Sequence, residues 1–280
     1  MTASERLAQN VVQTRFESLD ETDVYRTKMR ILDAIGCAIA GANGYGCREM
    51  LNLVKQWGGA PESTIINHGG KVPAHNAAML NSLMTRSFDF EAVQAEGDNK
   101  TCPAHISGTT VPVALAMAER EAASGKDLIA ALAAGNDLAS RLGVASGFDF
   151  SLGWDNTGTI NTFGAAAIAC KLLKMNEKQV FNAFGIALSQ VAGSMAGVFD
   201  KTMSFKLAIS LASRNGIFAA ELAKQGYAGV NEPFMGPRGY FALFCRGACN
   251  VDDLTRDLGK KYYADCVIKP YSACRATHPS

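Results

Sequence analysis

The sequence predicts an all-α fold, and three observations lead to that prediction. Apolar residues recur at three- and four-residue steps through most of the 280 residues, which is the period of an amphipathic helix. The same segments are rich in Ala, Ser and Gly, which let helices pack closely on one another. Only one short segment of the first half, residues 63–66, is prone to form a strand.

The first long helix is expected over residues 22–42, where Val24, Ile31 and Ile35 mark the apolar face and an Asn-Gly pair follows the end. Glycine or Ser-Gly breaks also separate most of the later segments. The helices expected after it are residues 50–57, 73–87, 111–124, 126–141, 159–173, 177–192 and 205–225.

Composition and charge exclude several classes of protein. The net charge is +1 with no block of one sign, so neither nucleic acid nor an anionic membrane is an expected partner. The apolar runs are interrupted before they reach about 18 residues, so no membrane span is expected. The start of the chain lacks the pattern of a secretory signal, and the eight cysteines contain no C-x-x-C pair. We therefore expect a cytoplasmic protein with reduced thiols and no metal site.

The loop before the helix at 111–124 carries the first candidate site. Arg86, Asp89 and Glu91 precede His105, and a histidine titrates near neutral pH, as a general acid or base must. The alternative is structural: the two acids are solvated and His105 only packs near the next helix.

Two further loops carry polar residues at helix starts. Asp155 and Thr157 stand where backbone N–H groups can receive an anion, although ordinary capping is the commoner use of such residues. Lys201 and Lys206 flank an uncharged stretch at the head of a long helix, where a cation is mildly unfavourable. An anionic ligand would favour both lysines there, whereas solvated lysines are the alternative.

The last residues gather further cations, namely Lys269 and Arg275, beside Cys274 and His278. Fixed positive charge suits an anionic small molecule better than a hydrophobic core. The segment is interpreted either as a polar tail or as the first part of a second domain.

Read in order, these loops resemble the MmgE/PrpD family, which includes 2-methylcitrate dehydratase. The resemblance covers nearly the whole chain and depends on seven ordered motifs, of which the histidine loop Pro-Ala-His-Ile-Ser-Gly is one. The similar segments are residues 32–41, 76–82 with 89–90, 103–108, 157–159, 163–167, 226–229, and 269–271 with 275–278.

The resemblance implies a large helical domain over residues 1–250. Residues 251–280 would then be a linker and the truncated start of an α+β lid domain. It also implies a homodimer, chemistry without a cofactor, and a small di- or tricarboxylate as the substrate. A separate chain that supplies the lid is a further expected partner.

Carried over residue by residue, the resemblance places Asp89 and His105 at the acidic and histidine site positions and Lys269 at the entrance of the lid. Asp155 stands where many relatives have a histidine, and residues 94–100 lengthen the acidic loop. Lys206 replaces, or is displaced from, the lysine of a Lys-x-Leu-His stretch.

Three hypotheses follow for the function. In a dehydratase-like lyase, His105 would move a proton next to a carboxylate, Asp89 would orient it, and Lys206, Lys269 and Arg86 would bind the substrate. Lys201, Thr157, Asp155 and Arg275 complete the expected binding set. An epimerase of a dicarboxylate needs no acid for a leaving group and is the second hypothesis. The third is an inactive or split enzyme without its lid.

Overall fold

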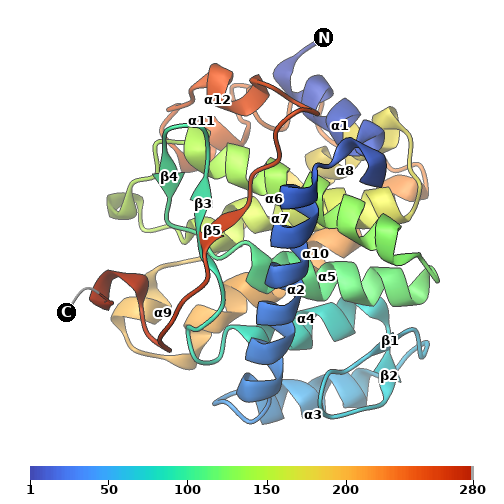
Figure 1. Ribbon diagram of the computed structural model, residues 1–280, viewed down its shortest axis with the longest axis vertical. Coiled ribbons are helices and arrows are strands. Elements are labelled where there is room, and N and C mark those ends of the chain that lie inside the picture. Colours follow the sequence, from blue (N-terminus) through green and yellow to red (C-terminus); the bar gives the residue numbers. More distant parts are fainter. Residues whose placement is uncertain (279–280) are drawn as a thin grey trace.

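The computed structural model describes residues 1–278, apart from the side chain of Phe150, and it is mostly helical with two small sheets (Figure 1). This confirms the helical fold predicted from the periodicity. The longer helices are α1 (Ala3–Gln13), α2 (Glu21–Gly41), α3 (Cys47–Trp57), α4 (Ala74–Thr85), α5 (Ser107–Arg120), α6 (Gly125–Ala145), α7 (Asn156–Leu172), α8 (Glu177–Leu188) and α10 (Leu207–Lys224). The short ones are α9 (Ala196–Phe199), α11 (Tyr240–Phe244) and α12 (Val251–Thr255).

Helix α7 lies at the centre and packs against α5, α6, α8 and α10. Nearly every residue of α7 is buried, so it is a core helix with no solvent-exposed face. Small residues make this packing possible: a Cβ at Gly216 of α10 would lie 2.6 Å from the backbone nitrogen of Ala166, and one at Gly135 of α6 would lie 2.7 Å from the carbonyl oxygen of Gly164. The close helix approach expected from Ala, Ser and Gly is confirmed at these two contacts.

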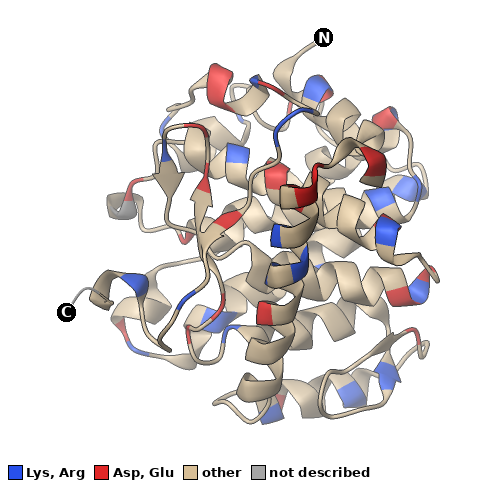
Figure 2. Cartoon of the chain, viewed as in Figure 1, with Lys and Arg blue, Asp and Glu red and all other residues tan. Residues whose placement is uncertain are grey.

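Helix α6 is long and apolar enough to cross a membrane by length and composition alone. However, 94% of that window is buried inside the protein, which is the environment of a core helix. Along the ribbon of Figure 2, charged residues of both signs are interspersed in the helices and loops.

The prediction of a single strand in the first half is wrong. Strand β1 (Ser63–Thr64) does form and pairs with β2 (Lys71–Val72), but β3 (Val93–Glu96) and β4 (Thr101–Cys102) form a second antiparallel pair. Their third partner is β5 (Asp265–Val267), so the sheet order is β4-β3-β5. Strands of two to four residues are too short to show an alternating pattern, and β3 also depends on pairing with the distant β5, which no local pattern reveals.

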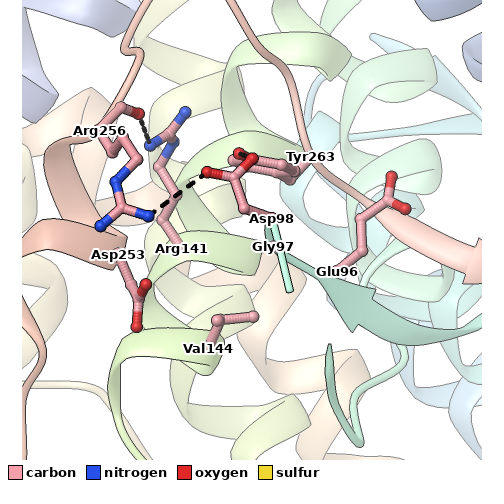
Figure 3. Close-up of a pocket in the computed structure, with 8 residues that line it drawn as sticks. All are labelled: Glu96, Gly97, Asp98, Arg141, Val144, Asp253, Arg256 and Tyr263. Atoms are coloured by element: carbon pink, nitrogen blue, oxygen red, sulfur yellow. Dashed lines mark hydrogen bonds and ion pairs between the residues drawn. The ribbon is translucent and has the colours of Figure 1, made fainter. Parts of the chain in front are cut away.

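Residues 251–278 lie against the helical body. The guanidinium group of Arg141, only 1% exposed, contacts the buried carboxylate of Asp137 and donates to the carbonyl oxygens of Leu254 and Lys261. It also donates to the carbonyl oxygen of Arg256, the contact drawn in Figure 3. Strand β5 then continues the segment along β3. The domain division at residue 250 stays a prediction.

Candidate active site

The candidate site is a cleft of about 840 Å³ between the loops that follow α4, β4 and α8. Eight of the nine predicted site residues line it, although they come from distant parts of the chain. They are Arg86, Asp89, His105, Asp155, Thr157, Lys201, Lys206 and Arg275. The ninth, Lys269, lies behind Asp89 with its side chain fully buried.

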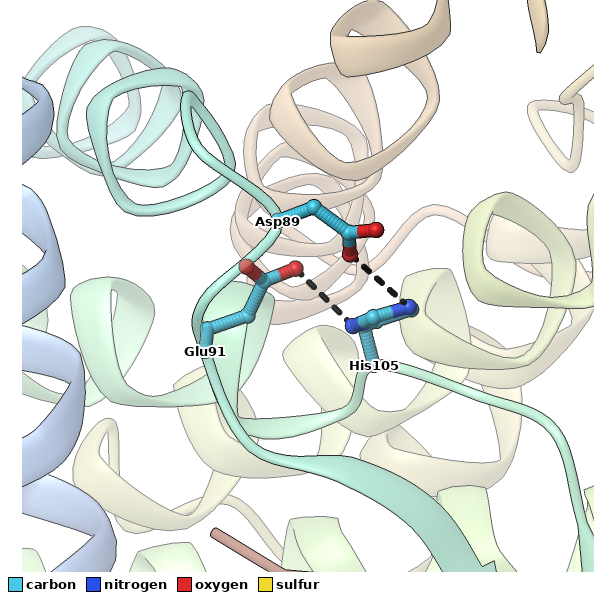
Figure 4. Close-up of side chains that lie close together, drawn as sticks. All are labelled: Asp89, Glu91 and His105. Atoms are coloured by element: carbon cyan, nitrogen blue, oxygen red, sulfur yellow. Dashed lines mark ion pairs between the residues drawn. The ribbon is translucent and has the colours of Figure 1, made fainter. Parts of the chain in front are cut away.

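The imidazole of His105 lies between two carboxylates (Figure 4). Its Nδ1 is 2.9 Å from Oε1 of Glu91, and its Nε2 is 3.7 Å from Oδ1 of Asp89. Glu91 is completely buried, so the alternative that this acid is solvated is wrong. The contacts of Glu91 are ion pairs without hydrogen-bond alignment, and neither of its oxygens has a hydrogen-bond partner within residues 1–278.

Two cations balance these two carboxylates. Nη1 of Arg86 contacts Oδ1 of Asp89 and lies 3.1 Å from Oε1 of Glu91. Nζ of Lys269 donates to both Oδ1 and the carbonyl oxygen of Asp89, at 2.6 Å each. Asp89 itself has a φ of 50°, in the left-handed region that only a few residue types tolerate, and its ion pairs help hold it there.

The pKa shifts follow from these pairs. Burial alone would raise the pKa of Glu91, but the charges of Arg86 and His105 outweigh it and lower this pKa to about 2. Burial likewise opposes the lowering of the Asp89 pKa, which Arg86, His105 and Lys269 bring about. Both acids are therefore carboxylates at neutral pH.

A metal ion is the competing use of this cluster, because Asp89, Glu91 and His105 each offer a ligand atom and these atoms lie within 4.8 Å of one another. However, Arg86 and Lys269 already neutralise the two carboxylates. A divalent cation would have to displace them or sit beside them against their repulsion. The donor set therefore suits proton transfer better than metal binding.

The remaining cations of the cleft fall into two kinds. Lys206 is buried, its Nζ donates to the carbonyl of Tyr45 and to Oγ of Ser87, and burial lowers its pKa. Lys201 and Arg275 are exposed, and neither side chain has a hydrogen bond or ion pair in the described part of the chain. The two exposed cations are therefore free to meet an anionic ligand.

The first turn of α7 supports the histidine loop. Asp155 caps the helix, accepting from the backbone N–H of Thr157, so the capping interpretation of Asp155 is confirmed although it also lines the cleft. Oγ1 of Thr157 accepts from the N–H of His105 at 3.3 Å, and the side-chain amide of Asn161 donates to the His105 carbonyl at 2.8 Å.

Cys102, just before this loop, is buried, and burial raises its pKa to about 12, so it is not a nucleophile.

Sequence reasoning missed the roles of Glu91, Asn161 and Asp265. Glu91 belongs to the acidic cluster of the first loop. Its position two residues after Asp89 was the sequence feature that could have indicated a second acid beside the histidine. Asp265 accepts from the N–H groups of Ile106 and Ser107, more than 150 residues away in sequence, and no local pattern indicates that contact.

Together, the fold and the site define a helical domain whose interhelical loops gather one histidine, three acidic side chains and several cations at a single cleft. The MmgE/PrpD N-terminal domain matches residues 5–250, and the chain belongs to this family.

The sequence is also similar to two named fungal proteins. The chain is 27% identical over 264 residues to the cis-aconitate decarboxylase-like protein oryM of Aspergillus oryzae, a match that covers 89% of this chain and 54% of that protein. It is also 27% identical over 270 residues to a cis-aconitate decarboxylase of Aspergillus terreus, covering 90% of this chain and 53% of the relative. The chain thus spans about half the length of the curated relatives it matches.

Proposed function

We propose that this chain carries the proton-transfer half of a lyase that acts on a small di- or tricarboxylate without a cofactor. The observation that carries the proposal is the position of His105. Its Nδ1 faces the buried Glu91, while the imidazole lies on a cleft lined by the free cations Lys201 and Arg275. Family membership and the names of the two relatives support the same class of reaction.

In the proposed reaction the cations hold substrate carboxylates, and neutral His105 removes a proton from the adjacent carbon through Nε2. The electron pair left on that carbon delocalises into the carboxylate, where Arg86 and the lysines stabilise the charge. In a dehydration, hydroxide then leaves with a proton from an acid, and Asp155 is the carboxyl group available on the cleft wall. In a decarboxylation no proton is removed first: the C–C bond breaks, CO₂ leaves, and the electron pair that stays on carbon takes a proton from a His105 that starts protonated.

An epimerase is the second candidate. Among the described residues that line the cleft, His105 is the one histidine. Removal and return of a proton need a second base on the opposite face but no acid for a leaving group, and Lys206 or Asp155 would supply that base.

We also propose that a second domain covers the cleft, either in a longer chain or as a separate polypeptide. Three large side chains on the cleft wall are exposed, namely Tyr45 (84%), Met203 (52%) and Val198 (44%), and the relatives are about twice as long. A homodimer and a cytoplasmic location remain proposals from the family resemblance and the composition.

The test is incubation of the protein in D₂O with 2-methylcitrate, citrate, cis-aconitate and iminodisuccinate, followed by proton NMR. An alkene or decarboxylated product supports a lyase, whereas deuterium exchange or a new stereoisomer without elimination supports the epimerase. His105→Ala should abolish turnover and leave the helical circular dichroism intact. Full activity of that variant, or no reaction of the folded wild type with any compound, would count against the proposal for this chain.

A further inference from the structure

A five-residue stretch near the C-terminal end, residues 265–269, contacts both loops of the site. Its first residue, Asp265, bonds to the backbone that follows His105, and its last, Lys269, bonds to Asp89. The stretch lies outside residues 5–250, which match the family domain. The family resemblance assigns Lys269 to the entrance of the lid but gives no role to Asp265.

Asp265 provides the N-terminal cap of α5 from a distant strand. Its Oδ1 accepts the N–H of Ile106 at 3.0 Å, and its Oδ2 accepts the N–H of Ser107 at 2.6 Å. The side chain is 3% exposed, so these hydrogen bonds are shielded from water. Burial raises the pKa of this carboxyl group, and the N–H groups of Ser107 and Ile106 oppose that shift. A carboxylate at the start of a helix is also favoured by the helix dipole.

Asp265 is itself rigidly placed. It pairs with Ala95 in the sheet, and its carbonyl oxygen accepts from Nε and Nη2 of the buried Arg30 at 2.9 and 2.7 Å. Strand β3, its sheet partner, begins two residues after Glu91. One small sheet therefore positions both the carboxylate partner of His105 and the cap behind His105.

The backbone around His105 is consequently held from two sides. Helix α7 holds the N–H and the carbonyl of His105 through Thr157 and Asn161, while Asp265 holds the next two N–H groups. The α7 bonds are 3.3 and 2.8 Å long and come from two side chains, whereas the Asp265 bonds are 3.0 and 2.6 Å long and come from one. A single buried carboxyl group therefore restrains both N–H groups that follow His105.

We infer that Asp265 is a positioning residue, which turns the imidazole of His105 so that Nδ1 faces Glu91 and Nε2 remains available to a ligand in the cleft. The inference deepens the proposed function and rests on it for its biological meaning, because proton abstraction needs Nε2 without its proton. The orientation itself can be measured without any substrate.

The experiment is NMR of protein labelled with ¹⁵N-histidine, which reports the tautomer of each neutral imidazole. The chain has four histidines, and His105→Asn assigns the signal of His105. The wild type should hold its proton on Nδ1. Asp265→Ala should increase the Nε2-protonated form and speed amide exchange at Ile106 and Ser107 by about tenfold, as expected from losing a hydrogen bond at each amide.

Asp253→Asn is the control, because it removes a contact of the neighbouring helix α12, the 2.8 Å pair with Lys100, and Asp253 has no bond to residues 103–108. It should leave the tautomer and both amides unchanged. If Asp265→Ala does not fold, Asp265→Asn is measured instead, because it keeps the shape of the side chain and one acceptor oxygen. It should give a smaller change of the tautomer and of the exchange rates in the same direction.

A folded Asp265 variant with the wild-type tautomer and exchange rates would overturn the inference. The outcome is separable from that of the proposed function. If Asp265→Ala changes the tautomer but the wild type is inert, the positioning role of Asp265 stands and the proposed lyase function is wrong. If the wild type turns over substrate and Asp265→Ala does so at the same rate, the positioning role of Asp265 is wrong and the proposed lyase function stands.

Discussion

Oε1 of Glu91 lies 2.9 Å from Nδ1 of His105, and Glu91 has no exposure to solvent. At this distance one of the two atoms must carry a proton, and the lowered pKa of Glu91 assigns it to the histidine. The pair therefore presents the opposite nitrogen of the ring to the cleft. A buried carboxylate behind a histidine is a common way to fix the tautomer of a general base.

Glu91→Gln should lower turnover by about 10² to 10⁴, the range that general acid–base catalysis contributes. The amide keeps the shape of the carboxylate but no longer favours a proton on Nδ1. Steady-state rates on whichever carboxylate the D₂O assay identifies would measure the loss. Asp98→Asn, a change on the surface beside Lys261, is the control and should be silent.

Acid should destabilise the protein through Glu91. The folded-state pKa is about 2 and the ordinary value 4.5, so the stabilisation is complete above pH 4.5 and is lost as the pH falls toward 2. The difference corresponds to about 3 kcal/mol. Urea unfolding at several pH values should show a shallower acid slope for Glu91→Gln than for the wild type, and equal slopes would contradict the assignment.

Asp33 should show the opposite pH dependence. Burial raises its pKa from 3.8 to about 6, although its side chain accepts the N–H of Ala92 at 3.0 Å. Its contribution to stability is therefore full below pH 3.8 and is lost as the pH rises through 6. Asp33→Asn keeps the acceptor and removes the charge, so it should stabilise the protein by roughly 1–2 kcal/mol at pH 7 and by nothing at pH 3.5. Thermal unfolding at the two pH values checks this.

Lys201 and Arg275 should contribute to anion binding, because they are the cleft cations without a protein partner among residues 1–278. Lys201→Ala and Arg275→Ala should each weaken the binding of citrate by about fivefold, or about 1 kcal/mol. Calorimetric titration with citrate at constant ionic strength is the measurement. Lys224→Ala removes an exposed lysine at the end of α10 and should bind citrate as the wild type does; an equal loss there would indicate a general charge effect.

Arg141→Met should release residues 254–261 from the helical body. The change leaves the buried Asp137 without its cation and the carbonyls of Leu254, Arg256 and Lys261 without their donor, at a cost of about 3–5 kcal/mol. Limited proteolysis should then cut this segment well before the helices. Arg256→Ala removes a half-exposed side chain of the same segment, whose ion pair with Asp98 is 3.7 Å long, and should change the cleavage rate little.

The helices were predictable because their signals are local. The apolar period and the flanking glycines place α2 and α10 within two residues of their observed ends. The start of α5 was expected four residues too late, since its cap is the distant Asp265 and not a neighbouring residue. The same reason hides β3 and β5, because β3 pairs with residues 265–267. Strand β4 pairs only with the neighbouring β3 and is two residues long, too short for an alternating apolar pattern to show.

The sequence by itself determined the helical class, the family and the loops that carry His105, Asp89 and the cations, because these follow from periodicity and from ordered motifs. Only the tertiary structure decided which carboxylate meets Nδ1 of His105, that Lys206 is committed to Tyr45 while Lys201 is free, and that Asp265 caps the histidine loop. Each of these depends on the packing of segments far apart in the chain. Burial and charge pairing at such contacts arise only when the chain folds.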